Sequence, residues 1–280
     1  MNDRGSAGEV SRHYAPLKVG AMLQTILDGL RAAGRDLDAL TTDDLAPVDQ
    51  FHSCGKPATL ELARLAGLAG GERVLDVGGG VGGPARTLAA EYGCTVTVLE
   101  LTEPYCQAGE RLTELTRLSH RVSFRHGNAF EMPFEDGSFD VAWTQHSSMN
   151  MEDKERLYAE IRRMLRPGGA LALHELMAGP VQPIYFPVPW APDPSISFLR
   201  PPDEIGGLLR RLGFAEKAWL DTTRPSLGWF RERAAAAAGL TPPPLGLHLL
   251  LGPLFGAAFR NVLRNLEEQR LVIVEAVFER

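Results

Sequence analysis

The spacing of apolar residues changes near residue 70 and divides the chain into a helical part and an alternating part. Between residues 19 and 33 apolar residues recur every three or four positions, which predicts a helix. Pro57 suits the first turn of a second helix over 57–68, and the polar run 41–44 is typical of a helix start. From residue 73 onward, short apolar and β-branched runs predict strands at 73–77, 95–99, 122–125, 139–144, 170–174, 214–220 and 271–278. The helical segments predicted between them are 84–92, 103–118, 153–165, 204–212, 229–238 and 254–269.

Strands and helices that alternate at this spacing predict βαβ units and a mainly parallel sheet with helices on both faces. We therefore expect an α/β protein with three parts. Residues 1–70 form a helical N-terminal cap, residues 71–222 form the core, and residues 223–280 supply a helical insertion and the final strand.

Residues 179–203 interrupt the alternation. Eight prolines lie between 179 and 202, interleaved with aromatic residues that include Tyr185, Phe186 and Trp190. Long loops inside compact domains commonly cover or bind ligands, so we predict a lid in which these three side chains enclose an apolar or cationic substrate. A stiff loop that packs its own aromatic residues is the alternative.

Composition and charge narrow the range of partners. The 280 residues carry a net charge of −6, which argues against a nucleic acid or an anionic membrane as the partner. Three scattered cysteines predict reduced thiols rather than a disulfide framework or a zinc site. The chain shows no secretory signal and no apolar run long enough to span a bilayer, so we expect a soluble, cytoplasmic protein with a small-molecule partner. The sequence leaves a homo-oligomer open.

A glycine-rich turn follows the first predicted strand, in the run VLDVGGGVGG over residues 74–83. Gly78, Gly80 and Gly83 match the spacing of a dinucleotide-binding turn, where the backbone approaches its ligand closely. Asp76, two residues before the first glycine, would repel a pyrophosphate and favour a ligand with positive charge. Glu100 ends the second strand, where a carboxylate can accept both ribose hydroxyls. These residues predict a nucleoside with a cationic tail.

The motifs resemble those of class I S-adenosylmethionine (SAM)-dependent methyltransferases. The resemblance covers roughly residues 50–222 and rests on the glycine run, on Glu100 and on the segments 127–134, 136–140 and 165–169. The GGPAR continuation over 82–86 and the segment 49–52 are similar to the branch that holds sarcosine/dimethylglycine, phosphoethanolamine and sterol methyltransferases. The family implies a Rossmann-like, seven-stranded, mostly parallel sheet whose last strand is reversed. It also implies SAM as cofactor and S-adenosyl-L-homocysteine as product.

The resemblance further implies a role for each matching residue. Asp76 and the glycine backbone would hold the amino-acid end of SAM, and Glu100 would hold the ribose. Asn128 and Ala129 would meet the adenine, and Leu101 would lie against its face. The family usually has Asp at the position of Asn128. The full set of cofactor-binding residues implied is Gln50, His52, Asp76, Gly78, Gly79, Gly80, Glu100, Leu101, Asn128, Ala129, Phe130 and Gln145.

The segment 144–151 after the fourth strand is placed where substrate meets the methyl group, and Met149 within it is a candidate substrate contact. It is not an Asn/Asp-Pro-Pro-Tyr motif, which counts against macromolecular substrates. His146 is the best-placed general base, or else a residue that only orients substrate. His174 and Glu175 end the fifth strand and are either catalytic or structural. Tyr14 offers a hydroxyl or a π-face, or else belongs to the core.

Neither His174 nor Glu175 has, with His146, the spacing of a helical metal pair, so no metal is predicted. The leading interpretation is a SAM-dependent methyltransferase for a small molecule in specialised, natural-product biosynthesis, with N-, O- or C-methylation unresolved. A glycine/sarcosine/dimethylglycine-type N-methyltransferase is the alternative. Remoter alternatives are an NAD-dependent oxidoreductase and a catalytically silent SAM-binding protein.

Overall fold

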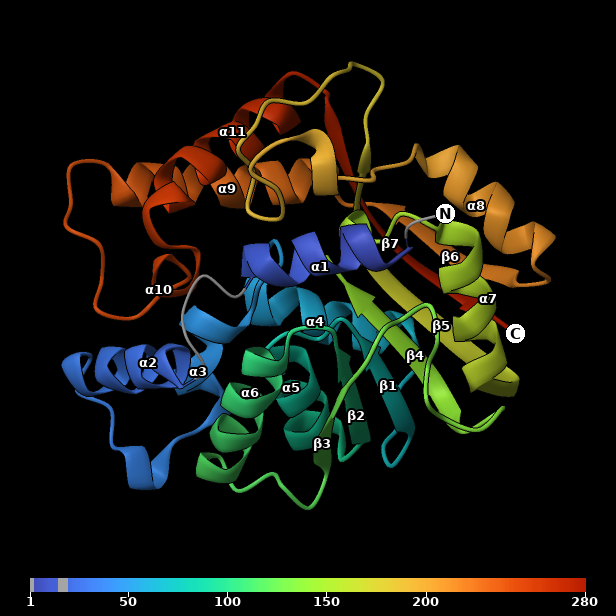
Figure 1. Ribbon diagram of the computed structural model, residues 1–280, viewed down its shortest axis with the longest axis horizontal. Coiled ribbons are helices and arrows are strands. Elements are labelled where there is room, and N and C mark those ends of the chain that lie inside the picture. The colour runs from blue at the N-terminus through green and yellow to red at the C-terminus, as the bar shows by residue number, and fades with distance from the viewer. Residues whose placement is uncertain (1–2, 15–19) are drawn as a thin grey trace.

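A computed structural model describes residues 3–14 and 20–280, and its centre is a seven-stranded sheet (Figure 1). The strand order is β3-β2-β1-β4-β5-β7-β6, in which β7 runs antiparallel to both of its neighbours and the other pairs are parallel. This arrangement confirms the predicted Rossmann-like fold with a reversed last strand. The strands are β1 Arg73–Val77, β2 Thr95–Glu100, β3 Val122–His126, β4 Phe139–Gln145, β5 Leu165–Ala178, β6 Ala215–Asp221 and β7 Leu271–Glu279.

The helices cover both faces of this sheet and its carboxyl edge. Four precede the sheet: α1 Asp3–Tyr14, α2 Ala21–Ala32, α3 Thr42–Asp49 and α4 Gly55–Leu65. The others are α5 Gly83–Tyr92, α6 Glu103–Leu115, α7 Lys154–Met164, α8 Pro202–Arg211, α9 Thr223–Ala237, α10 His248–Leu251 and α11 Phe255–Glu267. Within the described part of the chain, no helix is long and apolar enough to cross a membrane.

Predicted and observed elements differ where contacts distant in sequence set the boundaries. β5 is longer than the predicted 170–174, because Ala170 to Ala178 pairs residue by residue with β7. Helix α9 begins at Thr223, six residues before the predicted start at 229. Its first turn is fixed by β7, since the Thr222 amide donates to the Ile273 carbonyl (2.8 Å) and the Ile273 amide donates to the Thr223 hydroxyl (2.9 Å). Val19, at the predicted start of α2, lies outside the described residues.

Alternating side chains of the central strands enter two separate cores. Leu75 and Val77 of β1 pack on the face covered by α7 and α8, whereas Val74 packs on the face covered by α4 and α5. Burial on both faces explains why these strands read as continuous apolar runs. The only polar member of β1 after its first residue is Asp76, which faces the second side at the carboxyl end of the strand. A carboxylate in such a place requires a reason other than packing.

A third layer covers the carboxyl edge of the sheet. Figure 1 shows α1 crossing between the sheet and the pair α9 and α11, with the 179–201 loop above it. The loop is held by α11, because Asn265 exchanges two hydrogen bonds with the backbone of Tyr185 (2.8 and 3.0 Å) and Asn261 donates to the Pro187 carbonyl (2.9 Å). The loop is therefore a packed wall of the edge.

A buried ion pair joins the N-terminal cap to the core. Arg86 on α5 donates to the carboxylate of Asp49 at the end of α3 (2.9 Å), and both side chains are almost completely buried. The same guanidinium donates to the Gly109 carbonyl (3.3 Å) and the Thr113 hydroxyl (3.0 Å) on α6. Three helices therefore meet at one cation.

Removing this cation should strongly destabilise the protein. Arg86→Ala leaves the Asp49 carboxylate buried without its counter-charge, and we expect a loss of about 3–5 kcal/mol in the free energy of unfolding. The matched control is Arg31→Ala, which removes an exposed pair with Asp28 (2.8 Å) and should cost less than about 1 kcal/mol. Urea unfolding followed by circular dichroism measures both values, and equal losses would contradict the assignment.

Candidate functional site

A cavity opens where β1, β2 and β4 end. The space among its lining side chains is about 1440 Å³, including the open mouth. One end is formed by the glycine turn and by the acidic side chains of Asp76 and Glu100. The other end is apolar and is formed by side chains from the 179–201 loop and from helices α9 to α11: Trp190, Trp229, Phe230, Leu251, Phe259 and Val262.

The glycine turn brings backbone to the cavity surface. Gly78 and Gly80 have φ of +72° and +58°, which favours glycine. A Cβ on Gly78 would lie 2.8 Å from the Ser147 Cβ, and one on Gly79 would overlap the Asp76 carboxylate. A Cβ on Gly80 would meet only the Tyr105 ring, at 3.8 Å. Gly78 and Gly79 are therefore packed against Ser147 and Asp76, whereas the space beside Gly80 is open.

Asp76 carries a buried charge without a partner. It is 1% exposed, and its Oδ2 makes no hydrogen bond within the described residues. Burial, with a smaller contribution from nearby Glu100, raises the pKa of Asp76 to about 7. A cationic ligand group beside this carboxylate would restore the ionised form, so the site fits a ligand with a positively charged end.

Glu100 is fixed at the end of β2 by backbone donors. Its Oε2 accepts from the Gly80 amide (3.0 Å) and its Oε1 accepts from the Thr102 amide (2.8 Å). Burial raises the pKa of this carboxyl, although the two amides act in the opposite direction. Each oxygen keeps a second lone pair, which suits acceptance from ligand hydroxyls. Leu101, Ala129 and Phe130 line the cavity nearby, whereas the Asn128 oxygen already accepts from the Phe130 amide (2.9 Å).

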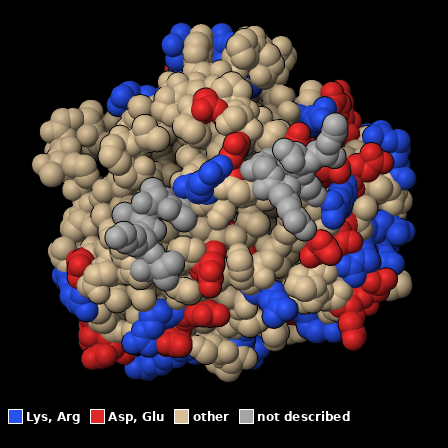
Figure 2. All heavy atoms as spheres, viewed as in Figure 1, with Lys and Arg blue, Asp and Glu red and all other residues tan. Residues whose placement is uncertain are grey.

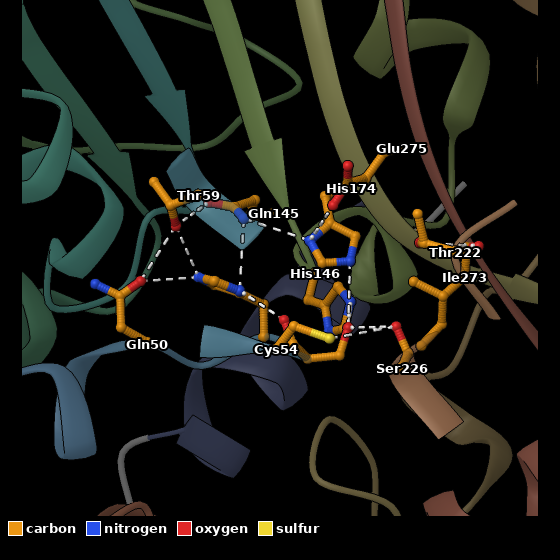
Figure 3. A network of polar contacts seen from close by, with 12 residues as sticks. Gln50, Cys54, Thr59, Gln145, His146, His174, Thr222, Ser226, Ile273 and Glu275 are labelled. Atoms are coloured by element: carbon orange, nitrogen blue, oxygen red, sulfur yellow. Dashed lines mark hydrogen bonds and ion pairs between the residues drawn. The ribbon is translucent and has the colours of Figure 1, made fainter. Parts of the chain in front are cut away.

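Three histidine rings, those of His52, His146 and His174, lie next to one another, and Figure 3 labels the last two. The Ser53 hydroxyl lies 3.3 Å from His146 Nε2 and 3.2 Å from His174 Nε2, and the rings of these two histidines are 4.7 Å apart. His52 lies beside them, with its Nδ1 3.1 Å from the Ser53 carbonyl. Within residues 3–14 and 20–280, no group of three or more His, Cys, Asp or Glu is arranged to hold a metal ion.

Burial makes the histidine cluster neutral. It lowers the pKa of His52 to about 4 and lowers the pKa of His146 and of His174 well below the usual value. The neighbouring histidines add to this effect for His146 and His174. His146 directly follows β4, has a left-handed φ of +48° and donates its amide to the His174 carbonyl (2.8 Å). A strained backbone at the rim of a cavity is typical of functional sites.

Glu175 supports the loop after β4 from beneath. Its carboxylate accepts from the Ser147 amide (3.5 Å) and the Ser148 amide (3.2 Å). Lys154 binds the same loop by donating to the Ser148 and Met151 carbonyls. Neither Glu175 nor His174 lines the cavity, so neither touches a ligand bound there, and their role, catalytic or structural, stays a prediction. Both side chains are turned into the interior, because the carboxyl end of β5 is covered by that loop.

Asn150 joins three segments that are far apart in the sequence. Its oxygen accepts from the Tyr14 hydroxyl (2.8 Å), and its amide nitrogen donates to the carbonyls of Trp190 and Ile196 (2.8 Å each). The cap, the loop after β4 and the 179–201 loop are thereby fixed to one another. Tyr14 lines the cavity and also belongs to the wall, and burial raises its pKa well above the usual value.

Most of the predicted site residues lie on the cavity. The lining includes His52, Asp76, Gly78, Gly79, Gly80, Glu100, Leu101, Asn128, Ala129, Phe130, Gln145, His146, Met149, Tyr14 and Trp190. Gln50 stands behind His52, to which its oxygen is hydrogen-bonded (2.9 Å). Tyr185 and Phe186 do not line it, and the prediction that they enclose substrate is corrected. The Tyr185 ring packs between the guanidinium groups of Arg264 and Arg270, whose carbons lie 3.7 and 4.4 Å from its centre.

Sequence reasoning missed several residues of the site. Ser53 and Asn150 are small polar residues without a motif of their own, and only their neighbours His52 and Met149 drew attention. The aromatic wall from α9 and α11 follows β6 in the chain and returns to the cavity through tertiary packing. No local pattern marked these residues as a binding surface.

Removing the Asn150 side chain should cost more unfolding free energy than removing the Tyr14 hydroxyl, which is one of its three partners. Asn150→Ala takes away three hydrogen bonds and leaves the carbonyls of Trp190 and Ile196 without their donor, so we expect a loss of about 2–4 kcal/mol in unfolding free energy. Tyr14→Phe removes one of the bonds and should cost about 1 kcal/mol. Urea unfolding of the two variants provides the comparison. A loss for Asn150→Ala no larger than that for Tyr14→Phe would show that the junction does not hold the segments.

Comparison with known proteins relates this architecture to methyltransferases. A family model described as "Methyltransferase domain" matches residues 75–173. A glycine/sarcosine/dimethylglycine N-methyltransferase of Actinopolyspora halophila is 33% identical over 132 residues, which is 47% of this chain and 23% of that protein. The chain spans about half or less of the length of the curated relatives it matches.

Solved structures with low identity share the whole fold. Geranyl diphosphate C-methyltransferase from Streptomyces coelicolor, solved with Mg²⁺, a substrate analogue and S-adenosyl-L-homocysteine, superposes with a TM-score of 0.73. It is 18% identical, and the match covers 100% of this chain and 99% of that one. The [4+2]-cyclase SpnF superposes with a TM-score of 0.66 at 23% identity, over 94% and 96% of the two chains. As the motifs predicted, residues 75–173 match a methyltransferase family model, and the chain as a whole shares the fold of these solved structures.

Proposed function

We propose that the protein transfers a methyl group from SAM to a neutral small molecule that is mostly apolar. The observation that carries this proposal is the unpartnered, buried carboxylate of Asp76 beside the open glycine turn. A sulfonium cofactor with an ammonium group satisfies that carboxylate, whereas a dinucleotide would bring a pyrophosphate against it. This argues against the oxidoreductase alternative.

The residues on the polar side of the cavity fit the parts of SAM. Asp76 and the backbone of Gly78 to Gly80 would hold the charged amino-acid end, and Glu100 would accept the ribose hydroxyls. Leu101 and Phe130 would flank the adenine. SAM supplies a methyl group on a cationic sulfur, which is a good leaving group. The protein then needs mainly to align the acceptor and exclude water.

The apolar end of the cavity favours a neutral acceptor. No Lys or Arg is among the described residues that line the cavity, whereas three acidic side chains are: Asp49, Asp76 and Glu100. A phosphate or diphosphate group would therefore be buried without a counter-charge. On the face of the molecule shown in Figure 2, few charged side chains lie at the upper left, where α9 to α11 are. More of them lie along the lower and right edges.

An N-methyltransferase for glycine-type amines remains the second candidate, because the relative from Actinopolyspora halophila carries that name. Against it stands the wall of Trp190, Trp229 and Phe259, which offers a small amino acid no partner for its carboxylate. Since SpnF is a cyclase on the same fold, the fold by itself does not fix the reaction.

SAM affinity should depend on the ionisation of Asp76. Because its pKa lies near 7, we expect binding to strengthen as pH rises through 7 and to weaken below it, as the carboxyl becomes protonated. Asp76→Asn should weaken binding above pH 7 by about 1.5–3 kcal/mol and remove this pH dependence. Calorimetry from pH 5.5 to 8.5 measures both effects, with the exposed Glu103→Gln as the matched control. Wild-type affinity that is the same at both ends would refute the contact.

The reaction itself is tested by supplying SAM and a panel of acceptors and following product mass. We expect one added methylene unit on neutral phenolic, indolic or polyketide-like compounds, and no product from prenyl diphosphates. Transfer to sarcosine or dimethylglycine alone would establish the N-methyltransferase alternative. SAM binding without transfer to any member would contradict the proposed activity.

A further inference from the structure

We infer that Glu275 is the terminal proton acceptor for His146, through Ser53 and His174, so that the methyl acceptor is one that loses a proton when it is methylated. This inference rests on the proposed function and adds the class of acceptor atom. Such acceptors are hydroxyl groups, N–H amines and acidic C–H groups. Tertiary amines and thioethers have no proton to lose and are excluded.

A line of polar atoms runs from the cavity to Glu275, in which the last contact has ion-pair rather than hydrogen-bond distance. His146 lines the cavity, and its Nε2 lies 3.3 Å from the Ser53 hydroxyl, which lies 3.2 Å from His174 Nε2. On the far side of that ring, His174 Nδ1 lies 3.8 Å from Glu275 Oε1. Figure 3 shows His146 just after β4, His174 on β5 and Glu275 on β7.

Glu275 has no structural partner that accounts for its place. It is 2% exposed in the middle of β7, and its Oε2 makes no hydrogen bond within the described residues. Burial and the charge of Glu61 on α4 raise its pKa to about 7. The titratable groups that face it are His174 from β5 and Glu61 and Cys54 from α4 and its cap. A buried carboxyl of this kind can exchange a proton near neutral pH.

When Glu275 is protonated, the indole of Trp143 sets the direction of the hydrogen bonds along this line of polar atoms. Indole nitrogen only donates, so its contact of 2.9 Å with Gln145 identifies that atom as the amide oxygen. The amide nitrogen of Gln145 then faces His174 Nδ1 at 3.4 Å, which makes Nδ1 an acceptor. His174 therefore carries its proton on Nε2 and donates to Ser53, and Ser53 donates to His146 Nε2. In this state His146 Nδ1 holds a proton and is no base.

Ionisation of Glu275 reverses the direction of the hydrogen bonds that link His174, Ser53 and His146. The carboxylate attracts a proton to His174 Nδ1, so His174 Nε2 accepts from Ser53 and Ser53 accepts from His146 Nε2. His146 Nδ1 is then the unprotonated ring nitrogen that remains for the cavity. Glu275 and the Gln145 amide thus compete for one nitrogen, and the ionisation of Glu275 decides whether His146 can act as a base.

The transfer step balances without a charged histidine. The acceptor forms its bond to the methyl carbon as the C–S bond breaks, and the electron pair of that bond goes to sulfur. The acceptor proton goes to His146 Nδ1, the His146 Nε2 proton goes to Ser53, and the Ser53 proton goes to His174 Nε2. The His174 Nδ1 proton ends on Glu275, which becomes a neutral acid and later returns the proton to solvent. This agrees with burial, which lowers the pKa of both histidines and disfavours their cations.

The first test needs no methyl acceptor. Long-range ¹⁵N–¹H correlation spectra report which nitrogen of each histidine is protonated, and His146→Gln and His174→Gln assign the signals. As pH rises through 7 we expect His146 to change from the Nδ1–H to the Nε2–H tautomer in the wild-type protein. Glu275→Gln should abolish the change. A His146 tautomer that is constant from pH 5.5 to 8.5 in the wild-type protein would overturn the inference, whether or not methyl transfer is observed.

The second test uses kcat at saturating SAM and acceptor, which removes the effect of Asp76 on binding. We expect the wild-type kcat to rise with pH as Glu275 ionises. Glu275→Gln should flatten this rise and lower kcat roughly 100-fold, as should Ser53→Ala. Glu61→Gln should move the rise to lower pH, because it removes a negative charge that raises the pKa of Glu275.

Glu279→Gln is the matched control, since it neutralises another carboxylate of β7, one that is half exposed and paired with Lys217 (3.1 Å). It should keep the wild-type profile, and thermal unfolding identifies any variant that does not fold. An active wild-type enzyme whose profile is unchanged in Glu275→Gln would overturn the relay and leave the methyltransferase function standing. A wild-type enzyme that transfers no methyl group would instead contradict the proposed function, and the tautomer measurement would still decide the relay.

Discussion

The contact between the N-terminal cap and the first βα unit is the constraint on which the cavity depends. The start of α5 approaches the end of α3 so closely that a Cβ on Gly83 would overlap the Asp49 carbonyl. Arg86 holds that approach by neutralising Asp49 in a place without water. The attraction is strong at low dielectric, and so is the penalty for losing either partner. With α3 fixed in this position, the segment from Asp49 to Ser53 forms one wall of the cavity.

The two ends of the cavity differ in charge: one end carries acidic side chains and the other is apolar. Asp76 and Glu100 are buried acids near the glycine turn, and both have a raised pKa because water is excluded. They favour a cationic ligand at that end. The other end is aromatic, so a ligand group gains there by burying apolar area rather than by pairing charge. Under the proposed function, the acidic end takes the cationic methyl donor and the aromatic end takes the neutral acceptor.

The histidine cluster shows how burial can keep basic side chains neutral and still connected. His52, His146 and His174 are linked to one another through Ser53 and Gln145. In such a network each hydrogen bond fixes the direction of the next, so one donor-only group at the end, Trp143, orients several side chains. Glu175 and Lys154 hold the loop after β4 above this network, and that explains why they are buried without facing the cavity.

The sequence by itself determined the strands, their order of alternation with helices and the cofactor end of the cavity. Those features depend on local chemistry: apolar runs buried on both faces, glycines where φ is positive, and Asp76 and Glu100 at strand ends. Tertiary structure alone decided the acceptor end. Tyr185 and Trp190 belong to one proline-rich loop, yet arginines on α11 and beyond it hold the first away from the cavity, while Asn150 holds the second against it. Ser53 and Glu275 are 222 positions apart and lie on either side of His174 only because the reversed β7 lies beside β5. Contacts of this kind depend on how whole elements pack, and no spacing along the chain encodes them.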